Sequence, residues 1–188
     1  SGTLAITGVT TLTAGAGAIT LGESGETTNF GRLTFNSAGA VVIAEDSATE
    51  LAGTSTADSL DLDSTGAVTD ADEASTTVTN QADIAGTAIT FGNHASTDAL
   101  HASTVTFNSA GAVVFSEDSA TELVGTSTAL SLDLDCTAGI SDDDTASYTV
   151  TNLAGFAAAA FTLVTLPSTD TVHAGTVTFN STGSGDFS

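Results

Sequence analysis

The chain has 188 residues, of which 23 are acidic and one, Arg32, is basic, so its formal net charge is −22. This balance excludes nucleic acid as a partner, because phosphate binding needs a basic surface, and it argues against adsorption to anionic membranes. No run of about 18 apolar residues occurs, so we expect no membrane insertion. The acidity suits an extracellular or cell-surface protein, because ions in salty or divalent-rich water screen like charges.

A long segment occurs twice in the sequence. The string Leu-Thr-Phe-Asn-Ser-Ala-Gly-Ala-Val starts at Leu33 and returns from Val105, an offset of 105 − 33 = 72, and a third copy starts at Val177. A constant period without insertions is typical of stacked-repeat proteins. We therefore expect one solenoid domain over residues 1–188, made of a partial repeat (1–32), two full repeats (33–104 and 105–176) and a second partial repeat (177–188).

Each 72-residue repeat divides further. The string at Leu33 resembles the string at Leu60, a third segment starts near Ile84, and the next copy starts at Val105, so the starts advance by 27, 24 and 21. Apolar residues alternate with polar ones in these strings, which predicts strands with one face inward. Gly, Ser, Thr, Asp and Asn between the strings predict turns. The pattern therefore indicates three turns of about 24 residues per repeat.

These features together predict an all-β fold, a right-handed parallel β-helix of about eight rungs. Each rung would add one strand spacing of about 4.8 Å to a rod. The interior would hold aligned columns of apolar side chains, with Phe35, Phe107 and Phe179 in equivalent places. Cys136, whose place Ser64 takes in the first copy, is expected to be a small buried or half-buried side chain.

A polar ladder is predicted at the first corner of the rungs. Asn recurs there in each copy, and Asp takes the same place in the intermediate rung. Such side chains satisfy the backbone groups of turns. The predicted ladder consists of Asn36, Asp63, Asn108, Asp135 and Asn180.

The repeated strings resemble the repeat regions of very large secreted bacterial surface proteins, the filamentous-haemagglutinin-like adhesins and related autotransporter passengers. The strings that carry the resemblance start at Leu33 and Ser59, together with Thr77-Val-Thr-Asn80 and its copy at Thr149. The resemblance covers nearly the whole chain. It implies an exported β-helical stalk used in adhesion or matrix building.

The acidic residues form clusters that the 27-residue offset would stack on adjacent rungs. Two carboxylates about 5 Å apart repel by roughly 1–3 kcal/mol, and a hard cation such as Ca²⁺ would reverse that sign. The alternative is a solvated acidic surface that keeps rods apart and soluble. The calcium hypothesis places Glu45 beneath Asp72, Asp46 beneath Glu73 and Glu117 beneath Asp144.

Catalysis is not expected. Some β-helices cleave polysaccharides, and paired aspartates can perform acid–base chemistry on sugars. Such a site needs unique residues added to the scaffold, whereas the acids of this chain repeat with it. Arg32 is the only Lys or Arg that could clamp an acidic substrate. We therefore predict a protein that is not an enzyme and has no cofactor, apart from the calcium of that hypothesis.

The expected function follows from the ends of the rod. An open β-helix end is an unpaired strand edge, and the sequence contains no capping helix. We predict a structural subunit of an extracellular filament, in which copies of the chain join head to tail by strand pairing. The alternative is a stalk segment of a giant secreted adhesin that binds a host, a surface or a glycan through another region.

Overall fold

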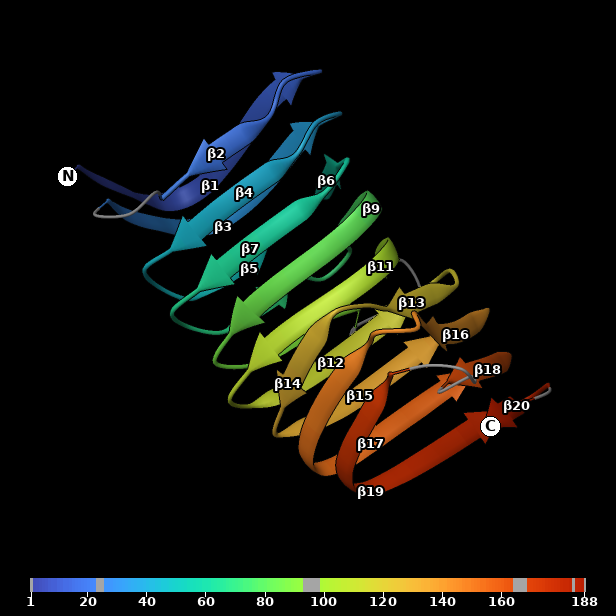
Figure 1. Ribbon diagram of the computed structural model, residues 1–188. Coiled ribbons are helices and arrows are strands. Elements are labelled where there is room, and N and C mark those ends of the chain that lie inside the picture. Colours follow the sequence, from blue (N-terminus) through green and yellow to red (C-terminus); the bar gives the residue numbers. More distant parts are fainter. Residues whose placement is uncertain (1, 23–25, 93–98, 164–168, 184, 188) are drawn as a thin grey trace.

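The structure is a computed structural model that describes residues 2–22, 26–92, 99–163, 169–183 and 185–187. Within these residues every regular element is a β-strand and no helix occurs. The twenty strands of these residues pair in parallel and wind round one axis, so that each turn stacks on the turn before it (Figure 1). The prediction of a right-handed parallel β-helix is confirmed.

Two stacks of strands, which we call sheet A and sheet B, run along the rod and enclose its core. Several long strands bend at a corner, and only part of each lies in the sheet named. Sheet A contains β2 (Ile19–Leu21), β4 (Val41–Glu45), β7 (Leu60–Ser64), part of β9 (Ser75–Gly86), part of β11 (Ala99–Ser109), β13 (Thr121–Leu123), β16 (Gly139–Asp142), β18 (Ala160–Leu163) and β20 (Gly185–Phe187). Sheet B contains part of β1 (Thr3–Gly15), part of β3 (Thr27–Ser37), β5 (Thr49–Leu51), β8 (Val68–Asp70), β10 (Ile89–Phe91), β12 (Ala112–Glu117), β15 (Ser131–Cys136), part of β17 (Ser147–Ala158) and part of β19 (Thr171–Ser181).

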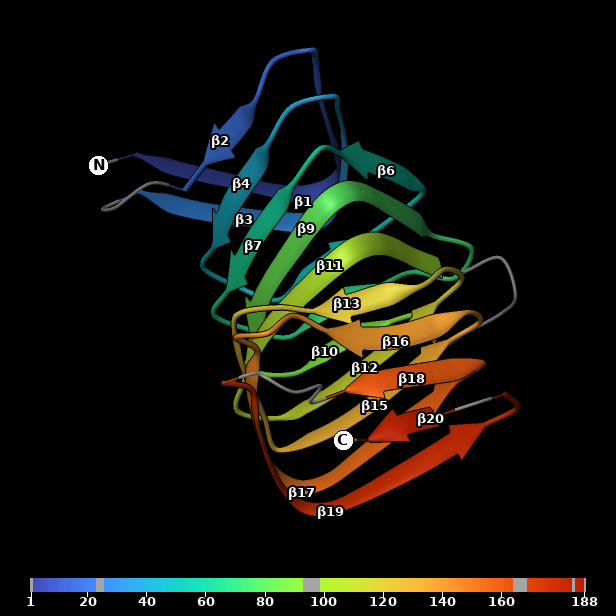
Figure 2. The ribbon, with the colours of Figure 1, turned by 45° about the vertical axis from the view of Figure 1, so that its right-hand side comes forward.

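A third side closes each turn, and it changes position along the rod. On the edge where the chain passes from sheet B to sheet A, which we call the BA edge, it consists of β6 (Thr54–Ala57) and the first parts of β9 and β11. On the opposite AB edge it consists of β14 (Thr126–Ala129) and the first parts of β17 and β19. The first parts of β1 and β3 also lie on the AB edge. Figure 2 shows the bends between these parts.

Alternation of side chains explains why these segments are strands. In β7, Leu60 and Leu62 are buried while Asp61 and Asp63 between and beside them are exposed. Corner turns follow the strands, and serine oxygens accept the hydrogen bond of the glycine N–H two residues later, as Ser37 Oγ does from Gly39 at 2.9 Å. Period-two burial and turn chemistry together therefore explain the local structure.

The core is a continuous stack of apolar side chains between the two sheets. Phe91 and Phe115 lie next to each other in sheet B with ring centroids 5.9 Å apart. Phe107 reaches Phe115 from sheet A at 6.1 Å. Such aromatic pairs contribute beyond the area they bury, so the stacked rings hold successive turns and both sheets together.

The 72-residue repeat makes 3.5 turns, not the three that we predicted. Leu33 belongs to sheet B, where it pairs with Leu51, but its copy Val105 belongs to sheet A, where it pairs with Ala82. From Leu33 to Val105 the chain passes from one sheet to the other seven times, which is 3.5 turns. Each copy is therefore turned by half a turn, and Phe35 and Phe179 lie in sheet B whereas Phe107 lies in sheet A.

The turns are also shorter and less uniform than the sequence predicts. In sheet A the column from Val41 runs through Leu60, Ala82, Val105 and Leu123, so the numbering advances by 60 − 41 = 19, 82 − 60 = 22, 105 − 82 = 23 and 123 − 105 = 18. The predicted length does occur in sheet B, where the step from Ile89 to Val113 is 113 − 89 = 24. Stacking tolerates these differences because only the paired strands must keep the same length; the corners absorb the rest.

The predicted corner ladder is divided between the two edges. On the BA edge Asn36 pairs with Thr56, whose hydroxyl donates to Asn36 Oδ1 at 3.0 Å. On the AB edge Asn108 pairs with Thr128 in the same way, at 2.6 Å. The half-turn between copies separates the residues that we predicted would stack. Asn36, Asp135 and Asn180 lie on the BA edge, and Asp63 and Asn108 lie on the AB edge.

Replacing Phe115 by alanine tests the core. Phe115 is 1% exposed and contacts rings from its own sheet and from the opposite sheet. We expect Phe115→Ala to lower the free energy of unfolding by about 3–5 kcal/mol in urea titrations, because the cavity spans both sheets. Leu130→Ala is the control, since Leu130 is 43% exposed. Leu130→Ala should lower the free energy of unfolding by about 0.5 kcal/mol or less, as most surface substitutions do. Equal losses for the two variants would contradict the described core.

Candidate functional site

Two buried glutamates lie where a stack of third-side strands stops on one edge of the rod. Glu45 and Glu117 occupy the same repeat position and are each 3% exposed. Glu45 ends β4 at the AB edge, next to the first part of β3, and Glu117 ends β12 at the BA edge, next to the first part of β11. At both places a tight corner, not another strand, comes next along the edge.

The carboxylate takes the place of the missing strand. The Phe30 N–H donates to both Glu45 oxygens, at 3.1 and 3.3 Å, and the Ala102 N–H donates to both Glu117 oxygens, at 3.1 and 3.4 Å. A buried N–H without a partner would cost about 1–3 kcal/mol. The glutamates therefore act as caps that end a run of strands without leaving these N–H groups unpaired.

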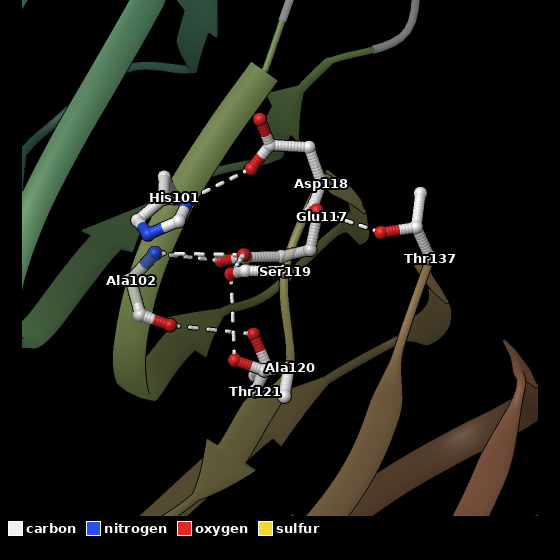
Figure 3. A network of polar contacts seen from close by, with 8 residues as sticks. All are labelled: His101, Ala102, Glu117, Asp118, Ser119, Ala120, Thr121 and Thr137. Carbon is white, nitrogen blue, oxygen red and sulfur yellow. Dashed lines mark hydrogen bonds and ion pairs between the residues drawn. The ribbon is translucent and has the colours of Figure 1, made fainter.

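The surroundings of Glu117 form a local polar network (Figure 3). The Ser119 hydroxyl donates to Glu117 Oε2 at 2.9 Å, and His101 Nδ1 lies 2.8 Å from Asp118 Oδ1 on the surface beside it. In the first copy Asn29 replaces the histidine and accepts from Ser47 at 3.1 Å. The repeated string Glu-Asp-Ser-Ala-Thr, at residues 45–49 and 117–121, was the available sequence signal for this cap, and our sequence analysis assigned its acids to a metal instead.

Burial disfavours the charged form of these carboxyls. Desolvation raises the pKa of Glu117 to about 7, opposed by the hydrogen bonds from Ser119 and Ala102. Desolvation also raises the pKa of Glu45, and the same cause, reinforced by neighbouring aspartates, raises the pKa of Asp83. These groups bind protons more tightly in the folded chain than in the unfolded one.

The calcium hypothesis required stacked acids, and the strand register does not stack them. Glu45 pairs with Ser64, not with Asp72, and Glu117 pairs with Cys136, not with Asp144. Asp46 lies at the following corner, where its backbone N–H donates to the carbonyl of Thr28. Glu73 lies in the turn after β8 with a φ of 63°. Among the residues that the structure describes, no group of three or more His, Cys, Asp or Glu side chains has a metal-binding arrangement.

Two open grooves flank the glutamate caps at equivalent repeat positions. One is lined by Glu45, Asp63 and Ser64, and the other by Glu117, Asp135 and Cys136, among others. Burial raises the pKa of the Cys136 thiol to about 12, so this sulfur is not a thiolate near neutral pH. Cys136 is buried, as predicted.

The two ends of the rod differ chemically from its flanks. Residues 1–22, which include β1 and β2, contain no Asp, Glu, Lys or Arg, and neither do residues 171–185, which include β19. Large apolar side chains are exposed there: Leu4 and Val9 in β1, at 42% and 59%, and Val177 and Phe179 in β19, at 37% and 43%. In the sequence every acidic residue except Asp186 falls between these two segments.

Comparisons with known proteins found no relative of this chain. No protein-family model, no curated protein sequence and no solved structure matches this chain. In the described part of the chain no helix is long and apolar enough to cross a membrane.

The raised carboxyl pKa values predict that acidification stabilises the fold. A pKa that is higher in the folded chain gives stability that is fully present below the unfolded value and is lost as the pH rises through the folded value. For Glu117 this window runs from its ordinary value of 4.5 to about 7. We therefore expect the melting temperature to fall between about pH 5 and pH 8, as followed by circular dichroism.

The variant Glu117→Gln isolates this effect. It keeps an oxygen that accepts from Ala102 but removes the titration, so the dependence on pH should become shallower. Glu122→Gln is the matched control on the next strand, because Glu122 is only partly covered. A pH profile of Glu117→Gln identical to that of the unchanged chain would show that Glu117 does not titrate in this range.

Proposed function

We propose that the chain is a non-catalytic structural subunit of an extracellular filament, and that copies join end to end by β-strand pairing. The observation that carries the proposal is the contrast between the end strands β1, β2 and β19, which contain no Asp, Glu, Lys or Arg, and the acidic flanks. Residues 1–22 and 171–185 carry no Asp, Glu, Lys or Arg side chain in a chain of net charge −22.

Open strand edges favour this use of the ends. Among the described strands β1 pairs only with β3, and β19 pairs only with β17, so each presents one unpaired edge along the axis. Unpaired edges readily pair with another chain, and natural proteins blunt edges that must not do so, often with charges. The strands β1 and β19 contain no Asp, Glu, Lys or Arg, so no charge on these two strands opposes pairing along the axis.

The flanks favour association along one axis alone. Sideways contact would bring together acidic surfaces of rods that each carry many carboxylates and a single arginine, whose Nη2 already donates to Glu50 at 3.1 Å. Such repulsion keeps rods apart and soluble. The same charge supports an extracellular location, because external salt screens the repulsion within each rod.

The alternative function is a stalk segment of a giant secreted adhesin that contacts a host, a surface or a glycan through another region. The repeat favours this alternative, because a third copy starts at Val177 and the same end layers would then pair with further repeats of one polypeptide. The resemblance to filamentous-haemagglutinin-like repeats also supports it. The mass of the native polypeptide separates the two functions: 18.4 kDa indicates a joining subunit, and a much larger mass indicates a stalk.

Electron microscopy of the purified 188-residue polypeptide tests the proposed function. We expect unbranched fibres one chain wide with an axial repeat of about 43 Å, because sheet A has nine strands within the described residues, at roughly 4.8 Å each. Phe179→Asp places a charge in β19, which has no Asp, Glu, Lys or Arg, and should abolish the fibres. Leu130→Asp, at a position of equal exposure on the flank, should leave them intact. A monodisperse 18.4 kDa species in sedimentation at every concentration tested would overturn the proposal.

A further inference from the structure

The first and last layers of the rod have the same outline. The chain begins with a long bent strand, β1, whose first part lies on the AB edge and whose second part lies in sheet B, and the short strand β2 follows in sheet A. The last layer repeats this arrangement: β19 has its first part on the AB edge and its second part in sheet B, and β20 lies in sheet A. Figure 1 shows these two layers at opposite ends.

The agreement in outline is specific to these layers. The third side lies on the AB edge at both ends of the rod but on the BA edge at β6, β9 and β11. A layer such as β11 and β12 has its third side on the BA edge. Placed on β19, it would leave the first part of β19, on the AB edge, unpaired. A layer of the β1 and β2 type matches all three sides at once.

The inward-facing side chains of the two layers also match one to one. In β1 these residues are Leu4, Ile6, Thr10 and Leu12, which pair with the inward residues Thr28, Phe30, Leu33 and Phe35 of β3. In β19 they are Val172, Ala174, Val177 and Phe179, which pair with Tyr148, Val150, Ala154 and Phe156 of β17. The residues of the β1 set advance by 2, 4 and 2 in number and those of the β19 set by 2, 3 and 2; in both strands an irregular pairing step falls between the second and third residue, and it accommodates the difference of one residue.

The first part of β19 can pair with a further strand. Ala174 has the repeat position of Phe30 and Ala102, whose N–H groups point to the following layer and are capped there by Glu45 and Glu117. A strand can equally follow on this edge, as β17 follows β14 and β19 follows β17. A strand from another chain would therefore satisfy the Ala174 N–H without a glutamate cap.

We infer that the partner of the C-terminal layer is the N-terminal layer of a second copy in one defined parallel register, an inference that rests on the proposed function. Thr171–Ala174 pair with Thr3–Ile6, Thr176–Asn180 pair with Val9–Thr13, and β20 pairs with β2. Phe179 then packs on Leu12, and the inward-facing exposed side chains Leu4, Val177 and Phe179 become core. Charge supports this occupant, because β1, β2 and β19 contain no carboxylate side chain, and Asp186 in β20 is the one acidic residue of the two layers.

A cysteine pair tests the register. In this register Thr178 of one copy lies opposite Thr11 of the next; both side chains are exposed and point outward from their strands. Neighbouring parallel strands lie about 4.8 Å apart, which is within the range of Cα separations that a disulfide spans. The variant Thr11→Cys/Thr178→Cys is made in a Cys136→Ser background, since serine is the natural residue at the equivalent position 64.

Mild oxidation should give a ladder of covalent multiples of 18.4 kDa that reductant removes. The control Thr3→Cys/Thr178→Cys moves one cysteine to the start of β1 and should give at least about tenfold less covalent dimer, because its Cα separation exceeds the disulfide range. Circular dichroism establishes that both variants fold.

The outcomes separate the register from the function. Fibres that form without a Thr11–Thr178 cross-link, or with equal cross-linking of the control, overturn the register while the filament function stands. The absence of both fibres and cross-links overturns the filament function, and the register with it. Cross-linking of the matched pair alone supports both.

Discussion

Backbone pairing between successive turns is the constraint on which the whole structure depends. Each strand of a parallel β-helix offers N–H and C=O groups to the next turn, and buried groups without partners are costly. Where the next turn supplies a strand, the pairing continues, as from β14 to β17 to β19. Where the next turn supplies only a corner, a glutamate side chain accepts the N–H instead, as Glu45 does from Phe30 and Glu117 does from Ala102. The buried carboxyls thus follow from the change of edge, and their raised pKa values follow from the burial.

The sequence predicted the fold class but not the number of turns, and the reason is physical. Leu33 and Leu60 start similar strings, yet Leu33 lies in sheet B and Leu60 in sheet A, so the 27-residue offset is 1.5 turns, not one. Both sheets bury Leu, Val, Ile and Phe on their inner faces and expose polar residues outside, so one string fits either sheet. Similarity within the sequence therefore marks equivalent strands without telling which sheet they occupy.

The same ambiguity explains the wrong stacking of the acids. A 27-residue offset was expected to place Glu45 beneath Asp72, whereas the turn that starts at Glu45 ends at Ser64, an advance of 64 − 45 = 19. Since the corners differ in length, no single offset converts sequence position into height along the rod. The sequence did contain the repeated string Glu-Asp-Ser-Ala-Thr, but its role as a cap could be recognised only once the strand pairing was known.

The half-turn between copies also distributes charge. Asp61 and Asp63 point outward from sheet A, and their copies Asp133 and Asp135 point outward from sheet B, on the other side of the core. In a solenoid with whole turns per repeat, the copies of each acid would recur on one side of the rod. The sheet A neighbours Asp61 and Asp83 repel each other, but their copies Asp133 and Gly155 make no second such pair, because glycine replaces the second aspartate. Both flanks of the rod are therefore acidic, whereas the end strands β1, β2 and β19 contain no acidic side chain.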